Sequence, residues 1–138
     1  MFKSTLSKNV EWGHCDPAKI VFYPNYFIWF DQSSHQLFKN AGVGMEKLIK
    51  MYGIIGLPIV DARAEFILPS KFNDLIKITS WISEWKEKSF VIYHEIHNDG
   101  EIAVKGSEVR VWAKLHPKNH LLIKTDVIPN ELKNNFET

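Results

Sequence analysis

The hydrophobic pattern of this chain changes its period once, and that change restricts the fold more than any other feature. From Pro24 to Ala41, large apolar residues recur at spacings of three and four, which predicts one amphipathic helix. Pro24 suits the first turn of a helix, and Gly42 suits the left-handed residue that ends one. From Ile59 onward the period is two, which predicts strands. A single long helix must therefore bury its apolar face against a sheet.

The predicted fold class is α+β, with one long helix wrapped by a curved antiparallel sheet. A shorter helix is expected over residues 45–52, and the tight-turn sequence Asn98-Asp99-Gly100 predicts a hairpin. The alternation of Val60, Ala62 and Ala64 with polar neighbours predicts a half-buried strand. Strands are expected at residues 5–12, 59–68, 75–85, 90–97, 102–115 and 121–128.

Composition narrows the class of protein. The chain has 138 residues, of which 45% are hydrophobic and 24% charged, so we expect a single globular domain over residues 1–138. The net charge is +1 and only Arg63 and Arg110 are arginines, which argues against a nucleic-acid partner. Because no apolar run approaches 20 residues, we expect no membrane partner. The single cysteine, Cys15, favours a reducing compartment and a cytoplasmic location.

The loop ahead of the long helix carries the strongest candidate for chemistry, Asp16. A helix start presents unpaired N–H groups that suit a developing oxyanion. A carboxylate near such an end stays ionised, so it is able to act as a base or a nucleophile. The structural alternative is that Asp16 only opens a turn before Pro17, which is common for this residue pair.

Other candidates have less support. Cys15 lacks the partner pattern of a catalytic thiol, and His14-Cys15-Asp16 does not match the spacing of metal ligands. The segment His94-Glu95-Ile96-His97 has the wrong spacing for a zinc site and lies in a predicted strand. We therefore expect no metal site. Asp31 and His35 lie one turn apart beside the apolar face of the helix, either as a solvated flank or as part of a site.

Several stretches of the chain, in order, resemble the motifs of one known family. They are Asp16-Pro17-Ala18-x-Ile20-Val21-x-Tyr23-Pro24-Asn25-Tyr26 with Trp29-x-Asp31, then Gly53-Ile54-x-Gly56-x-Pro58-Ile59-Val60, Glu84-Trp85-Lys86-x-Lys88-Ser89-Phe90-Val91, and a shorter match at Glu108-Val109-Arg110-Val111. On these motifs the chain resembles the 4-hydroxybenzoyl-CoA thioesterase family, whose members have the hotdog fold.

The resemblance implies a hydrolase of acyl-CoA thioesters that needs no metal, serine triad or cofactor beyond the coenzyme A of its substrate. In such a protein the residue matching Asp16 attacks the thioester carbonyl or activates water. The backbone N–H of the residue matching Tyr23 polarises that carbonyl. The residue matching Asp31 contacts the hydroxyl group of an aromatic acyl moiety, with Leu57 in the same substrate-binding region.

The family resemblance also implies a place for coenzyme A and an oligomer. Residues matching Lys86, Lys88 and Ser89 lie near the nucleotide and its phosphates. The active site forms between two subunits, so a homodimer or homotetramer is implied. Aromatic side chains such as Trp81 and Trp112, together with a long edge strand, also favour a partner subunit.

The sequence departs from the family motif at several positions. Lys19 replaces a glycine, His14 stands where an acidic residue is common, Leu57 replaces a threonine, and Glu87 interrupts a basic stretch. The reaction type therefore transfers better than the acyl group, which is either aromatic or a short or medium aliphatic chain. Two other functions stay open: a hydratase or dehydratase that uses His14 with Asp16, and a non-catalytic acyl-CoA binding module.

Overall fold

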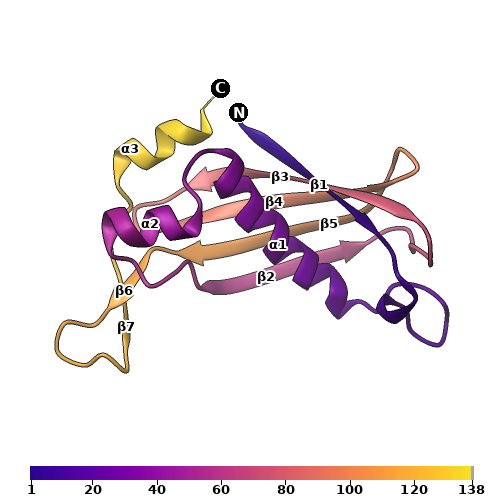
Figure 1. The fold of residues 1–138 in the computed structure, drawn as a ribbon, viewed down its shortest axis with the longest axis horizontal. Coiled ribbons are helices and arrows are strands. Elements are labelled where there is room, and N and C mark those ends of the chain that lie inside the picture. Colours follow the sequence, from indigo (N-terminus) through magenta and orange to yellow (C-terminus); the bar gives the residue numbers. More distant parts are fainter. Residues whose placement is uncertain (138) are drawn as a thin grey trace.

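The computed structural model describes residues 1–137, and its main element is a five-stranded antiparallel sheet. The long helix α1 (Pro24–Asn40) lies across one face of this sheet (Figure 1). The α+β class predicted from the change of period is therefore confirmed. The sheet order is β1-β3-β4-β5-β2, with β1 Lys3–Asn9, β2 Ile59–Phe66, β3 Leu75–Trp85, β4 Ser89–Asn98 and β5 Glu101–Val111.

Both predicted helices form where the local signals place them. Pro24 occupies the first turn of α1, and the chain leaves the helix through Ala41 and then Gly42, whose φ of 83° is left-handed. The helix α2 (Met45–Tyr52) ends at Gly53, also left-handed. A short helix α3 (Asn130–Lys133) and a 3₁₀ turn η2 (Asn134–Phe136) close the far end of the core.

The core between α1 and the sheet consists of two apolar clusters. One lies toward the start of α1 and includes Trp29, Phe30 and Ile78, and the other lies toward its end and includes Phe38 and Phe90. Gly106 on β5 allows the helix to approach closely, because a Cβ atom there would lie 2.4 Å from the Phe30 ring. The buried polar residues described below lie between the two clusters.

Some predicted strand limits are wrong. The first strand ends at Asn9, and the 3₁₀ turn η1 (Trp12–His14) follows. The strand expected over 102–115 divides at Trp112 into β5 and β6 (Ala113–Leu115), because β6 leaves the main sheet to pair with β7 (Ile123–Thr125). The expected last strand is correspondingly short. The 98–100 hairpin is confirmed: the φ values of Asp99 and Gly100 are 52° and 79°, as a tight turn of this kind requires.

Two predictions of burial are also wrong. The strand β2 is not half-buried, since Val60 and Phe66 are 63% and 50% exposed. As an edge strand it has a neighbour on one side only, and α1 leaves most of it uncovered. Trp112, expected to need a partner subunit, is instead buried within its own chain, in contact with Tyr52 of α2. Part of the exposed apolar surface lies at the β2 edge, and another part lies on the β6–β7 hairpin, where Leu121 is 92% exposed.

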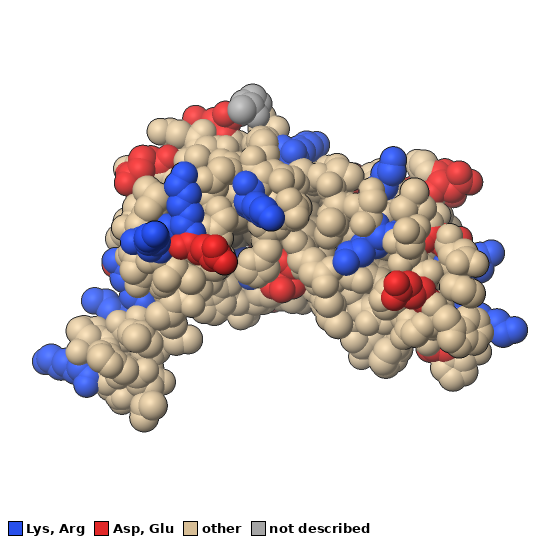
Figure 2. Space-filling model, viewed as in Figure 1, with Lys and Arg blue, Asp and Glu red and all other residues tan. Residues whose placement is uncertain are grey.

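Charges on the helix side of the molecule are mixed rather than gathered into one patch (Figure 2). The β6–β7 hairpin projects from the main body at the lower left of the same view. Within residues 1–137, no helix is both long enough and apolar enough to span a membrane.

Candidate active site

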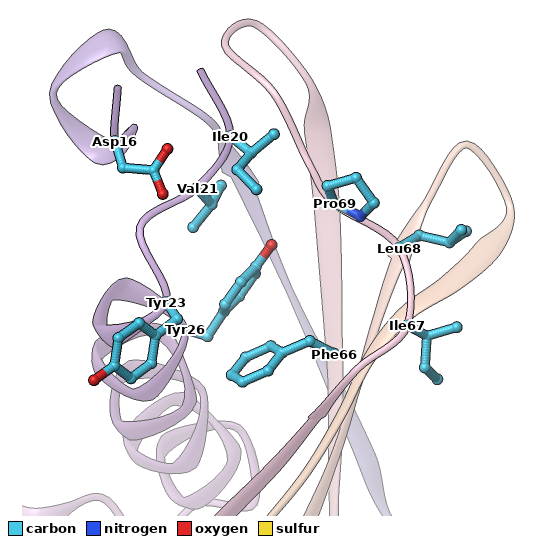
Figure 3. A pocket seen from close by; sticks show the side chains of 9 residues that line it. All are labelled: Asp16, Ile20, Val21, Tyr23, Tyr26, Phe66, Ile67, Leu68 and Pro69. Carbon is cyan, nitrogen blue, oxygen red and sulfur yellow. The ribbon is translucent and has the colours of Figure 1, made fainter. Parts of the chain in front are cut away.

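A cavity of about 380 Å³ lies where the loop before α1 faces the end of β2 (Figure 3). Most of its lining is apolar, and Asp16 supplies the one carboxylate among the lining residues. The lining residues are Asp16, Ile20, Val21, Tyr23, Tyr26, Phe66, Ile67, Leu68 and Pro69.

The backbone of a tight turn holds Asp16 at the edge of this cavity. Its N–H donates to the carbonyl of Ile20 (2.9 Å), and its carbonyl accepts from the N–H of Lys19 (2.8 Å). The side-chain oxygen Oδ1 accepts the N–H of Ala18 at 2.8 Å. The second oxygen, Oδ2, has no hydrogen-bond partner within residues 1–137. Asp16 therefore opens a turn, as the structural alternative expects, yet it keeps one oxygen available for chemistry.

Tyr23 lines the same cavity and carries an unpaired backbone donor. It is the last residue before α1, and its N–H donates to no other residue of the described chain. Because Pro24 has no N–H, the Tyr23 amide is the first donor that the helix start offers. In Figure 3 the hydroxyl of Tyr23 points away from Asp16 and from the other lining residues, so its phenol is not placed for chemistry at the cavity. A free amide at a helix start suits a developing oxyanion.

Tyr26 and Phe66 form an aromatic wall that the sequence did not identify. Their ring centroids lie 5.6 Å apart, and Phe66 also meets the Tyr23 ring at 6.3 Å. Burial raises the pKa of Tyr26, so its phenol stays protonated. The apolar run of residues 66–69 directly after a strand was the available signal, since such a run at a strand end is exposed unless it lines a cavity or an interface.

The other predicted substrate-binding residues lie elsewhere in the single chain. Lys86 and Lys88 lie in the turn between β3 and β4, and Ser89 is the first residue of β4. The Asp16 loop instead meets the opposite end of β3, through the contact of Val10 with Asp74. The length of β3, at about 3.3 Å per residue, puts these two ends roughly 33 Å apart (Figure 1). One chain therefore does not bring the lysines to Asp16.

Asp31 and Leu57 are likewise outside the cavity. Asp31 lies eight residues after Tyr23 on α1, about 12 Å along the helix axis. Its Oδ1 accepts a hydrogen bond from Arg110 Nη2 at 2.8 Å, while Arg110 Nη1 donates to the carbonyl of Leu57 at 3.0 Å. The Leu57 side chain itself is part of the core. The structure thus brings Asp31 and Leu57 together through Arg110, but not with Asp16.

A buried polar network supports Arg110 and was not predicted. Glu108 accepts from Arg110 Nη2 through Oε2 (3.0 Å), and its Oε1 contacts both His94 Nε2 (2.9 Å) and the Ser34 hydroxyl. His94 Nδ1 lies 2.6 Å from Ser80 Oγ. Burial alone would raise the pKa of Glu108, but the hydrogen bond with His94, the charge of Arg110 and the Ser34 hydroxyl lower it to about 2.

This Ser–His–Glu chain resembles a catalytic triad but has no access to a substrate. Ser80 and His94 are fully buried, and the Phe30 ring stacks on the His94 ring at 4.6 Å. The group is therefore a structural network. The position of His94 in its strand is the signal for this network. His94 lies on the same inward face as Ile92 and Ile96, where a buried polar side chain requires hydrogen-bond partners.

His14 and Cys15 have structural contacts. His14 Nδ1 accepts the N–H of Glu11 (2.9 Å) and its ring meets the edge of Trp29, so it does not line the cavity. The Cys15 thiol lies 3.7 Å from the carbonyl of Glu11. In the part of the chain that the structure describes, no three His, Cys, Asp or Glu residues gather as a possible metal site.

Comparisons with known proteins identify the family of this chain. Residues 10–136 match the family model described as the thioesterase-like superfamily. The chain is 35% identical over 115 residues to the 4-hydroxybenzoyl-CoA thioesterase of Pseudomonas sp. (strain CBS-3), and the match covers 79% of this chain and 82% of that protein. It is 24% identical over 102 residues to a 1,4-dihydroxy-2-naphthoyl-CoA hydrolase of Prochlorococcus marinus (strain NATL1A), over 70% and 68% of the two chains.

Solved structures give the same result. The crystal structure of an Asp-to-Asn mutant of 4-hydroxybenzoyl CoA thioesterase, complexed with 4-hydroxybenzoyl CoA, superposes with a TM-score of 0.88 at 29% identity over 98% of this chain and 99% of that one. A gentisyl-coenzyme A thioesterase superposes with a TM-score of 0.80 at 33% identity, over 96% and 98%. The chain belongs to the thioesterase-like superfamily, with the hotdog fold of its 4-hydroxybenzoyl-CoA thioesterase relatives.

Proposed function

We propose that this chain hydrolyses the thioester of a hydroxylated aromatic acyl-CoA, with Asp16 as the reacting group. Membership of the family makes it a thioesterase, a hydrolase that acts on thioester bonds. Its relatives at 35% and 33% identity are named for 4-hydroxybenzoyl-CoA and gentisyl-CoA, which supports an aromatic acyl group. The observation that carries the proposal is the free Oδ2 of Asp16 at an apolar cavity that is also lined by Tyr23, whose backbone N–H is unpaired within the described residues.

The arrangement suits two routes of hydrolysis. In one, Asp16 attacks the carbonyl carbon, the coenzyme A thiolate leaves, and water then cleaves the resulting anhydride. In the other, Asp16 takes a proton from water, and the water oxygen attacks instead. Both routes place negative charge on the carbonyl oxygen, and the Tyr23 N–H stabilises that charge in either case. The reaction needs no cofactor beyond the coenzyme A of the substrate.

A two-fold dimer through β2 supplies the residues that one chain keeps apart. The β2 edge exposes Ile59, Val60 and Phe66, whereas the opposite edge, β1, is rich in lysine and hydroxyl side chains. When identical strands pair antiparallel about a two-fold axis, the Phe66 end of one faces the Ile59 end of the other. Ile59 pairs with Arg110, so this arrangement moves the partner's Asp31 region and its 86–89 turn toward the Asp16 cavity.

The dimer has a direct test. Sedimentation at micromolar concentration should give at least twice the 16.1 kDa mass of one chain. Val60→Lys, at an exposed edge position, should yield folded single chains with little thioesterase activity, since an edge lysine opposes strand pairing. The matched control Ser7→Lys, on the β1 edge, should change neither mass nor activity. A wild-type mass of one chain would contradict the dimer and the shared site.

Release of coenzyme A from a panel of acyl-CoA thioesters tests the function itself. The panel contains 4-hydroxybenzoyl, benzoyl, butyryl and octanoyl thioesters, and a thiol reagent follows the product. Of the four thioesters, we expect the hydroxylated aromatic one to give the highest turnover. If an aliphatic thioester gave the highest turnover, the proposed substrate class would be contradicted. If the protein bound acyl-CoA but released no coenzyme A, it would be a binding module. A hydratase is not supported, because His14 does not line the Asp16 cavity and its Nδ1 is occupied by the N–H of Glu11.

A further inference from the structure

Asp31 and the backbone at Leu57 share one buried support, the guanidinium of Arg110. Nη2 donates to Asp31 Oδ1 at 2.8 Å, and Nη1 donates to the Leu57 carbonyl at 3.0 Å. These two residues come from α1 and from the segment before β2, and no other hydrogen bond in the described chain connects them. A single side chain on β5 therefore links the two by hydrogen bonds.

Arg110 is itself fixed in place. Its side chain is only 4% exposed, and Nη2 also donates to Oε2 of the buried Glu108 at 3.0 Å. Glu108 is held in turn by His94 and Ser34, and His94 by Ser80 and by the stacked ring of Phe30. Each member of this chain of contacts is closely packed, so the guanidinium has little freedom to move.

The contact with Arg110 leaves Asp31 with one oxygen occupied and one available. Oδ1 accepts from Arg110 and lies 3.5 Å from His35 Nε2, whereas Oδ2 has no hydrogen-bond partner within residues 1–137. The Asp31 side chain is 48% exposed, so Oδ2 is open to a ligand. A carboxylate oxygen only accepts hydrogen bonds, and a fixed acceptor selects a ligand that brings a donor to the same point.

We propose that Arg110 is a positioning residue that fixes Asp31 so that its free oxygen selects acyl groups carrying a hydrogen-bond donor. This inference rests on the proposed function, whose two-fold dimer brings the Asp31 region of each chain toward the Asp16 cavity of the other, where the acyl group binds. Arg110 does not touch the substrate, and its whole effect on substrate choice passes through Asp31. The lysine of Arg110→Lys keeps the charge but has one nitrogen, which is unable to meet Asp31, Glu108 and the Leu57 carbonyl in the same geometry.

The test compares kcat/KM for 4-hydroxybenzoyl-CoA and benzoyl-CoA, which differ by one hydroxyl group. The ratio of the two values on one preparation does not depend on how much of the protein is folded. We expect a wild-type ratio of about 10 or more, the size of one hydrogen bond to a charged acceptor. Asp31→Asn and Arg110→Lys should each bring the ratio close to 1. Lys77→Arg, the reverse exchange at an exposed position of β3 away from the β2 edge, is the control and should keep the wild-type ratio.

The double variant decides how Arg110 acts. In the Asp31→Asn background, Arg110→Lys should leave the ratio unchanged, because the two residues act on one interaction. A further change there, or a single Arg110→Lys variant that keeps the wild-type ratio, would overturn the inference. If Arg110→Lys yields no folded protein, Glu108→Gln replaces it, and the ratio should again fall. A wild-type protein that hydrolyses none of the acyl-CoA panel would overturn the proposed function, whereas hydrolysis of both substrates at equal kcat/KM would overturn this inference alone.

Discussion

Asp16 and Glu108 are both carboxylates close to α1, and their surroundings are opposite. Asp16 accepts one backbone N–H through Oδ1 and keeps Oδ2 free at an apolar cavity. Glu108 is 2% exposed, and both of its oxygens are occupied, by His94 and Ser34 on one side and Arg110 on the other.

The comparison shows that residue type alone does not identify a reacting group. Glu108 has a histidine, a serine and an arginine around it, which is the set of partners expected of a catalytic acid, but no substrate reaches it. Asp16 has few partners, and this is what leaves an oxygen available. This contrast supports our proposal that Asp16 carries the chemistry, whereas Glu108 stabilises the core and supports Arg110.

The largest predicted effect on stability concerns Glu108. Its pKa is about 2 in the folded protein, below the ordinary value of 4.5, so its ionised form stabilises the fold at and above about pH 5. That contribution, about 3 kcal/mol, is lost as the pH falls from 5 to 2. Glu108→Gln should lower the free energy of unfolding at pH 7 by about this amount and flatten its fall at acid pH. Urea unfolding at a series of pH values measures both.

The control for this prediction is Glu101→Gln, at the exposed start of β5, which should keep the wild-type profile. An acid profile of Glu108→Gln that follows the wild type from pH 5 to pH 2 would show that Glu108 does not have the assigned role. For Asp16 we expect almost no effect on stability: Asp16→Asn should change the free energy of unfolding by less than about 0.5 kcal/mol.

A smaller effect is expected in the turn that holds Asp16. Lys19 adopts a left-handed backbone conformation with φ of 67°, in which a side chain is strained and glycine is not. Lys19→Gly should therefore raise the free energy of unfolding by about 1 kcal/mol and retain turnover. Thermal and urea unfolding measure the change. The same substitution at the neighbouring Ala18, which has no positive φ, should destabilise the protein, and equal effects at both positions would contradict the strain.

The smallest predicted effect concerns the lysines of the β3–β4 turn. Both Lys86 and Lys88 are exposed, and exposed ion pairs contribute little each. Replacing both with alanine should raise KM for an acyl-CoA about threefold at low salt, with a smaller rise at high salt. A truncated thioester without the nucleotide should show no change. The double variant Lys8→Ala, Lys77→Ala is the control and should keep the wild-type KM. An unchanged KM for the acyl-CoA in the Lys86, Lys88 variant would show that this turn does not bind coenzyme A.

The sequence predicted the elements that local signals determine. The apolar spacing from Pro24 to Ala41 and the glycines at 42 and 53 correctly located both helices, and Asp99-Gly100 located the hairpin. The division of the last long strand at Trp112 was not predictable from alternation, because a change of pairing partner leaves the pattern intact.

The candidate site was predictable only in part for a similar reason. Asp16 and Tyr23 lie in one continuous motif, and the structure places both at one cavity. The contacts of Arg110 with Asp31 and Leu57 join residues 79 and 53 positions apart, so no local pattern contains them. The aromatic wall at Phe66 depends on how a strand end meets a helix start, which is a property of the fold.

The most direct test of the account is the turnover of Asp16→Asn on the acyl-CoA that the wild type hydrolyses fastest. Asparagine fills the same space and removes the charge, so we expect a loss of about 100-fold or more in kcat with an unchanged unfolding transition. Asp99→Asn, an exposed aspartate in the β4–β5 turn, should retain wild-type turnover. An Asp16→Asn variant that turns over within tenfold of the wild type would contradict the assignment of the chemistry to Asp16.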